Sequence, residues 1–192
     1  MRELARELAL SPGNLTYHFA RKEDLLLAIA ARLAVTNADT LQQLAQLTTF
    51  TQFFDAYRQL LRNQYQFRCF PLQLVYVLDT YPTLAARYGE NQLRRTSSFE
   101  AILRRLQAAG RLDANMDEAL LGQLVGYCTL IGRFWLSEFW ISYRDQPLDQ
   151  VIQRYVGLLA LALLPYTTEV GRREVEPYLT AQPATLSTTP LP

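Results

Sequence analysis

The sequence predicts an all-α protein with a short helix-turn-helix unit at its start and a larger helical bundle behind it. Apolar residues recur at helical spacing from residue 23 onward, and no segment shows the alternation of a half-buried strand. A strong helix-start signal stands at Ser11-Pro12. With 192 residues and 49% hydrophobic content, the chain can bury a sizeable core.

The first element is a short amphipathic helix over residues 1–8, followed by a tight turn into a second helix. Ser11 is suited to the N-cap of the second helix, and Pro12 suits its first position because proline has no amide to leave unpaired. Leu10 and Leu15 have the spacing of a hydrophobic staple across this start. The two helices therefore meet at a fixed angle.

The second helix presents polar side chains outward. Leu15 and Phe19, at i and i+4, point to the interior. The outer positions carry side chains of the types that read base edges and bind phosphates: Gly13, Asn14, Thr16, Tyr17 and His18.

The run from Arg2 to Phe19, continued by Lys22-Glu23-Asp24-Leu25, resembles the DNA-binding module of TetR-type (tetracycline-repressor-like) transcriptional regulators. The resemblance implies that the helix beginning at Ser11 enters the major groove. The contacts it implies fall on Asn14 and Thr16 for bases or phosphates, on Tyr17 and His18 for backbone or bases, and on Lys22 for a phosphate at a helix N-terminus.

The chain departs from the family pattern in three places. Ala9 stands at a turn where glycine is usual, and a left-handed alanine is strained by about 1 kcal/mol. Thr16 stands where tyrosine is common. The first of the family module's three helices should precede Met1, so we expect the chain to be truncated at its N-terminus, which leaves the inner faces of residues 1–19 without a packing partner.

Four helical segments follow. A long helix begins near Glu23, and a second spans about 51–67 with a broad aromatic inner face. Pro71 opens a short helix that ends near Tyr81-Pro82, and a long helix then runs to residue 109, where Gly110 stops it. Its arginine pairs at 94–95 and 104–105 alternate with apolar residues, which favours a solvated face.

Two strongly apolar helices at about 118–143 and 148–164 complete the predicted bundle. The resemblance implies that they pair with their copies in a homodimer, which places two recognition helices on a palindromic operator. We expect a truncated DNA-binding domain at 1–34, an effector-binding and dimerisation domain at 35–180, and a flexible Pro/Thr/Ser-rich tail at 181–192. Whether residues 167–179 form a helix is left open.

Composition argues against catalysis, cofactors and metals. His18 is the only histidine, Cys69 and Cys128 have no pairing or metal-ligand spacing, and no phosphate-cradling loop or nucleophile elbow appears. The net charge of +1 gives no bulk argument for nucleic acid. The chain opens into a charged helix rather than a signal peptide, and charges interrupt its apolar helices, so we expect a cytoplasmic protein without a membrane segment.

Aromatic residues with polar tips in the middle helices suit an effector pocket, although packing in the core or in a dimer interface is the stronger explanation for most of them. With the resemblance, this predicts a pocket lined by Tyr57, Tyr65, Tyr76, Tyr127 and Trp135. Few charges lie in these segments, which favours a small, mostly apolar effector.

Together these features predict a ligand-responsive transcriptional regulator, most simply a repressor, that binds operator DNA as a homodimer. The alternative is a dimeric small-molecule-binding or interaction module that lacks sequence-specific DNA binding because the first helix is missing. An all-α enzyme has no residue to support it.

Overall fold

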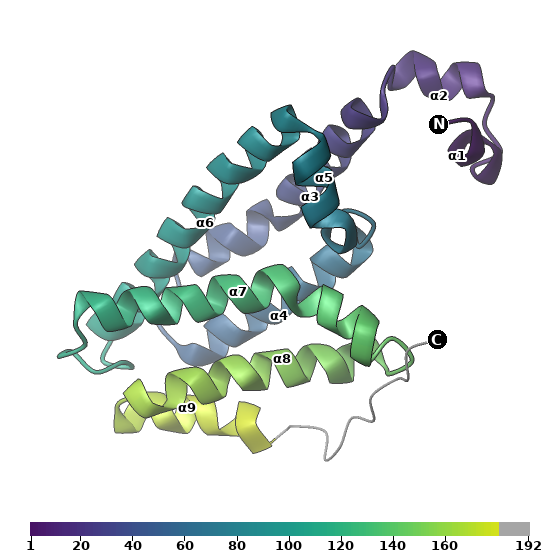
Figure 1. Ribbon diagram of the computed structural model, residues 1–192. Helices are drawn as coiled ribbons and strands as arrows, with labels where there is room; N and C mark the ends of the chain where they lie inside the picture. Colours follow the sequence, from purple (N-terminus) through teal and green to yellow (C-terminus); the bar gives the residue numbers. More distant parts are fainter. Residues whose placement is uncertain (181–192) are drawn as a thin grey trace.

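The computed structural model describes residues 1–180, and these fold into helices without a β-strand (Figure 1). The all-α prediction is confirmed. The α-helices are α1 (Arg2–Glu7), α2 (Pro12–His18), α3 (Lys22–Leu44), α4 (Phe50–Gln66), α5 (Leu74–Thr80), α6 (Pro82–Ala108), α7 (Glu118–Ser142), α8 (Leu148–Leu163) and α9 (Glu169–Thr180). Short 3-10 turns cover Pro71–Gln73 and Leu164–Tyr166. The tail expected at 181–192 lies outside the described residues.

The head consists of α1, α2 and the turn between them, and it projects from the body at the start of α3 (Figure 1). Ala9 adopts the left-handed conformation, with φ 53°. Its amide donates to the Arg6 carbonyl at 3.1 Å, and the Leu10 amide donates to the Ala5 carbonyl at 2.9 Å. These two bonds form a Schellman motif, which ends α1 and turns the chain toward α2.

The predicted start of α2 is also present. The Ser11 hydroxyl accepts a hydrogen bond from the Asn14 amide at 3.1 Å, and Pro12 is the first helical residue. Leu15 is buried and Phe19 is half-buried, so the inner face of α2 is the predicted one. Ala5 is the buried residue of α1, while Leu4, Leu8 and Leu10 remain exposed.

The body is built around α4, whose aromatic inner face contacts α3, α8 and α9. Thr49 caps α4 and accepts from the Gln52 amide at 3.3 Å. The largest core cluster contains buried side chains of α4, α6, α7 and α8, and Phe53, Tyr57 and Phe99 meet in it ring to ring. A smaller cluster joins α3, α5 and α6 through Leu26, Leu74 and Leu84.

Most of the segment 167–179, for which the sequence predicts no definite structure, belongs to α9, which spans Glu169–Thr180. The Glu174 carboxylate accepts from the Phe50 amide at 2.7 Å and from Arg111 Nε at 3.2 Å. One carboxylate thus satisfies an orphan amide at the start of α4 and fixes the α6–α7 loop. Thr168 Oγ1 donates to the Gly110 carbonyl at 2.7 Å on the same side.

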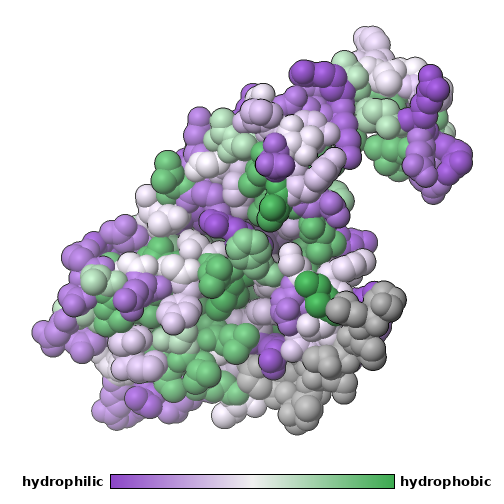
Figure 2. Space-filling model, in the orientation of Figure 1, coloured by the Kyte–Doolittle hydropathy of each residue, from purple (hydrophilic) through white to green (hydrophobic). Residues whose placement is uncertain are grey.

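The outer face of α7 and α8 is apolar, and hydrophobic side chains gather there in Figure 2. Its exposed members are Tyr127, Leu130, Phe134, Ile141, Leu158 and Leu161. By length and composition alone, α7 could cross a membrane, but a third of its most apolar window is already buried inside the protein. Gly122 and Gly126 face open space on this helix.

Candidate functional site

The predicted DNA-reading side chains lie together on one exposed surface of the head. Gly13, Asn14, Thr16, Tyr17 and His18 are all exposed in the described residues, and Tyr17 retains 85% of its accessible surface. Its ring meets that of His18 edge to face, with the centroids 5.2 Å apart. The structure therefore brings these five residues together, as the sequence predicted.

Thr16 differs from its neighbours because its hydroxyl is already engaged. It donates to the Pro12 carbonyl at 2.9 Å, one helical turn earlier. A hydroxyl that gives its proton to the helix can still accept a hydrogen bond, but it has none to donate to a phosphate oxygen. In this geometry Thr16 is suited to accept from a base donor rather than to bind a phosphate.

Lys22 is the first residue of α3, so its ammonium lies at a helix N-terminus. Asp24 accepts from the Arg21 amide at 2.9 Å and from the Arg21 guanidinium at 3.1 Å. The Arg21 hydrogen bonds hold the pKa of this carboxyl below its usual range. Asp24 is therefore paired with Arg21, and Lys22 forms no ion pair with any residue in the described range.

A cavity of about 310 Å³ opens in the body between α3, α4, α6 and α7, closed on one side by residues 70–74. The volume lies at the lower end of the range for small-molecule pockets. The cavity therefore lies between the middle helices and α7, the first of the two apolar helices.

The predicted lining needs correction, because Tyr57 alone of the five aromatics lines this cavity. Trp135 is buried in the core, where its indole N–H donates to Gln64 Oε1 at 2.7 Å. Tyr65 packs edge-on against Phe139. Tyr76 and Tyr127 lie on the outer surface. Tyr65 follows Gln64, which does line the cavity, and one step along a helix turns a side chain by about 100°.

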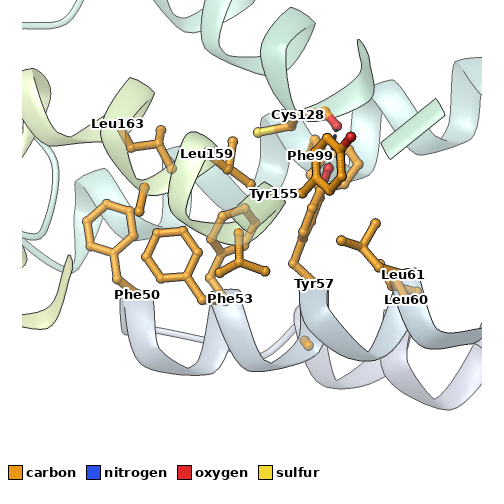
Figure 3. Packing of buried hydrophobic residues seen from close by; sticks show 14 of the residues in the cluster. Phe50, Phe53, Tyr57, Leu60, Leu61, Phe99, Cys128, Tyr155, Leu159 and Leu163 are labelled. Carbon is orange, nitrogen blue, oxygen red and sulfur yellow. Dashed lines mark hydrogen bonds between the residues drawn. The ribbon is translucent and has the colours of Figure 1, made fainter. Parts of the chain in front are cut away.

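Tyr57 projects from α4 across the core toward α7, with its hydroxyl at the Cys128 carbonyl (Figure 3). The hydroxyl donates to that carbonyl at 2.9 Å. Burial raises the pKa of Tyr57 well above its ordinary value, and the charge of Arg95 acts in the opposite direction. A Cβ at Gly132 would stand 3.1 Å from the hydroxyl oxygen, so glycine leaves the ring room at this point.

The cavity is more charged than the sequence indicated. Arg94, Arg95 and Arg133 line it, and the expectation of few charges is wrong. Arg94 lies at the exposed rim, 3.9 Å from Glu90, whereas Arg95 and Arg133 are half-buried. The solvated face expected for Arg94-Arg95 is therefore wrong for Arg95. Arg104, by contrast, is solvent-exposed and bonds Glu100 and Glu118.

A polar stripe on α6 is the sequence pattern that could have indicated the charged side of the cavity. Tyr88, Asn91, Arg95 and Ser98 recur at spacings of three and four, which places them on one helix face, and all four line the cavity. The α3 side contributes Leu33 and Ala34 among others.

A buried polar link ties α3 to α4 beside the cavity. Asn63, only 4% exposed, donates to Asn37 Oδ1 at 2.9 Å and receives a hydrogen bond from Gln59 at 2.8 Å. Because a buried amide without partners is costly, this link specifies the register of α3 on α4. The same α3 that lines the cavity carries Lys22 and the head at its other end.

An exposed helix-turn-helix surface on an all-α body defines a DNA-binding regulator. A family model described as a bacterial transcriptional repressor, TetR, matches residues 28–175. That is more than half of the chain, and the chain belongs to the TetR family. It is a regulator and not an enzyme.

The fold has a match among solved structures. The crystal structure of a TetR-family transcriptional regulator from Marinobacter aquaeolei VT8 is similar with a TM-score of 0.82 and 23% sequence identity. The match covers 94% of this chain and 87% of that one. A comparison with curated proteins gives no match.

Proposed function

We propose that the protein is a ligand-responsive transcriptional repressor that acts in the cytoplasm and binds a palindromic operator as a homodimer. One observation carries the proposal. The single helix α3 has the DNA-reading head at its first residue and lines the cavity from Ala30 to Leu41. An occupant of the cavity therefore contacts the element that positions the head.

The response follows from differential binding. A ligand that contacts Leu33, Ala34 and Leu41 on α3 shifts the head only if it binds one position of α3 more tightly than another. The apolar part of the effector fits the leucine-rich side of the cavity. Release of operator DNA is the direction expected for a repressor.

Dimerisation supplies the second head. The exposed apolar face of α7 and α8 suits pairing with its own copy, through the helices around 118–143 and 148–164. Gly122 and Gly126 would let a partner helix approach closely. A two-fold axis between the copies matches the two halves of a palindromic operator.

The test is an electrophoretic mobility shift with the promoter DNA that flanks the gene. Asn14→Ala should relax base preference at one position of each half-site, by about tenfold if one bidentate contact is lost. Asn115→Ala, in the loop between α6 and α7, is the matched control and should leave the preference unchanged. Absence of any sequence preference in the unmodified protein would refute operator recognition.

A second candidate is a dimeric small-molecule-binding or interaction module without sequence-specific DNA binding. The observation that favours it is the apolar surface of the head, where Leu8 is 54% and Leu10 40% exposed. A head with so little apolar burial has little free energy to hold α2 in place. The same mobility shift distinguishes the two candidates, because the module would bind effector and shift no DNA.

A further inference from the structure

We propose that the cavity binds a small amphipathic carboxylate, with Arg95 and Arg133 as the cations that receive the acid group. The proposal rests on the cavity being the effector site and adds the chemical class of the ligand. It is carried by the charge around the cavity, by the pairing of those charges, and by the distribution of apolar side chains.

The cavity wall has excess positive charge. Three arginines line it and no aspartate or glutamate does, in the part of the chain that the structure describes. Among the same residues, no carboxylate lies within 4.0 Å of the guanidinium of Arg95 or Arg133. Arg133 lies over the Phe134 ring at 5.9 Å, and its Nε is buried without a hydrogen-bond partner. A half-buried guanidinium with an unmet N–H favours an anion beside it.

The two arginines approach the cavity from facing helices. Arg95 belongs to α6 and Arg133 to α7, and these helices pack against each other. The Tyr57 hydroxyl also belongs to this part of the cavity, because it lies beside Gly132, the neighbour of Arg133, and the charge of Arg95 acts on its pKa. An acid group at this position would be within the field of both cations.

Three other polar side chains around the cavity form hydrogen bonds within the protein. Tyr57 donates to the Cys128 carbonyl, and Asn37 Oδ1 accepts from Asn63. Ser98 donates to the Arg94 carbonyl at 2.8 Å. None of these bonds neutralises a guanidinium. A carboxylate would therefore meet cations that the protein has left without a counter-charge.

The apolar lining of the cavity accepts an apolar tail. It is formed by Leu33, Leu41, Leu60, Leu61, Phe70 and Leu74. At roughly 30 Å³ per non-hydrogen atom, 310 Å³ holds on the order of ten such atoms, the size of a short fatty acid or a bicyclic aromatic acid. Burial of this tail provides affinity, and the acid group fixes its direction.

The test uses the full dimeric protein and two matched pairs of probes, octanoate with octan-1-ol and 2-naphthoate with 2-naphthol. Isothermal titration calorimetry at pH 7.5 should show that at least one acid binds about tenfold or more tightly than its alcohol. Arg95→Gln and Arg133→Gln should each remove most of that preference and leave alcohol binding unchanged. Arg95→Lys should restore part of it, because the charge is kept.

Arg87→Gln is the control, because Arg87 is an exposed arginine of α6 outside the cavity. It should keep the full preference for the acid. Equal affinity for acid and alcohol, an unchanged preference in both glutamine variants, or no binding of either acid would each overturn the proposal.

Operator binding measured without ligand separates this proposal from the regulatory one. Operator recognition without acid binding would refute the carboxylate site and leave the regulator standing. Acid binding that fails to change operator affinity would support the carboxylate site and refute the ligand response.

Discussion

Ala9 and Gly110 occupy the same position in two copies of one motif. Each residue follows the end of a helix with positive φ, 53° for Ala9 and 71° for Gly110. At Gly110, as at Ala9, two successive amides donate back into the last turn, to Gln107 and Leu106. The Schellman motif thus occurs twice in the described part of the chain. At Gly110 it has the residue that adopts positive φ without strain, and at Ala9 it has one that is strained there.

Exchanging the residues should move stability in opposite directions. Ala9→Gly relieves the Cβ strain and should stabilise the head by about 0.5–1 kcal/mol, after the added entropy of the unfolded chain. Gly110→Ala should destabilise the body by about 1 kcal/mol. Hydrogen exchange of the head amides and thermal unfolding of the body measure the two effects. A protective effect of Gly110→Ala would contradict this account.

Lys22 should bind phosphate without reading sequence. Lys22→Ala is expected to weaken operator and random DNA equally and to reduce the slope of log affinity against log salt by about one. Arg172→Ala, an exposed cation of α9, removes the same charge far from the head and should leave the slope unchanged. Fluorescence anisotropy at several salt concentrations gives both slopes. A selective loss of operator binding would assign Lys22 a base contact instead.

At the scale of elements, α9 depends on one close backbone approach. A Cβ built on Gly171 would lie 2.1 Å from the Arg111 carbonyl oxygen. The contact is with backbone, so no side chain can rotate away. Glycine at this position therefore allows α9 to lie against the α6–α7 loop.

Gly171→Ala should consequently lower stability by more than about 2 kcal/mol, because α9 must move off the loop. Gly89→Ala is the matched control. Gly89 lies in α6 with open space around its Cβ position, so alanine there should stabilise by about 0.5–1 kcal/mol through helix propensity. Urea unfolding followed by circular dichroism compares the two variants. Similar free energies of unfolding for the two variants would show that α9 can move away from the loop without loss of stability.

Local sequence signals predict the helices, whereas the residues that line the cavity depend on how the helices face one another in the fold. The cap at Ser11 and the stop at Gly110 are readable because they involve neighbouring residues. The cavity wall is not readable in this way, since it depends on which face of α4 meets α6 and α7. Tyr57 and Tyr65 are both aromatic on one helix, yet only Tyr57 points into the cavity. The sequence does not predict α9, whose helical pattern is short and contains Pro177.

At the scale of the whole molecule, the exposed apolar face of α7 and α8 is the surface on which the proposed homodimer depends. Leu161, near the end of α8, is 57% exposed on this face. If the proposed homodimer forms through this face, Leu161→Asp should convert it to monomer, because a charge would be buried at the two-fold contact. Sedimentation velocity measures the change, and operator affinity should fall with it. Val170→Asp, equally exposed on α9, should leave both unchanged.

The hydrogen bond between Asn63 and Asn37 holds α3 against α4 at one point, so that α3 can tilt about this point. The stretch 22–36 extends about 22 Å from this point to the head. Ala30, Leu33 and Ala34 line the cavity between Asn37 and the head. A bound molecule would therefore contact the part of α3 that carries the head. A tilt of about 8° would displace Lys22 by about 3 Å, and in the proposed homodimer the second copy would double this to about two base-pair steps. An occupant no larger than the cavity could thus carry two recognition helices out of phase with successive turns of the double helix.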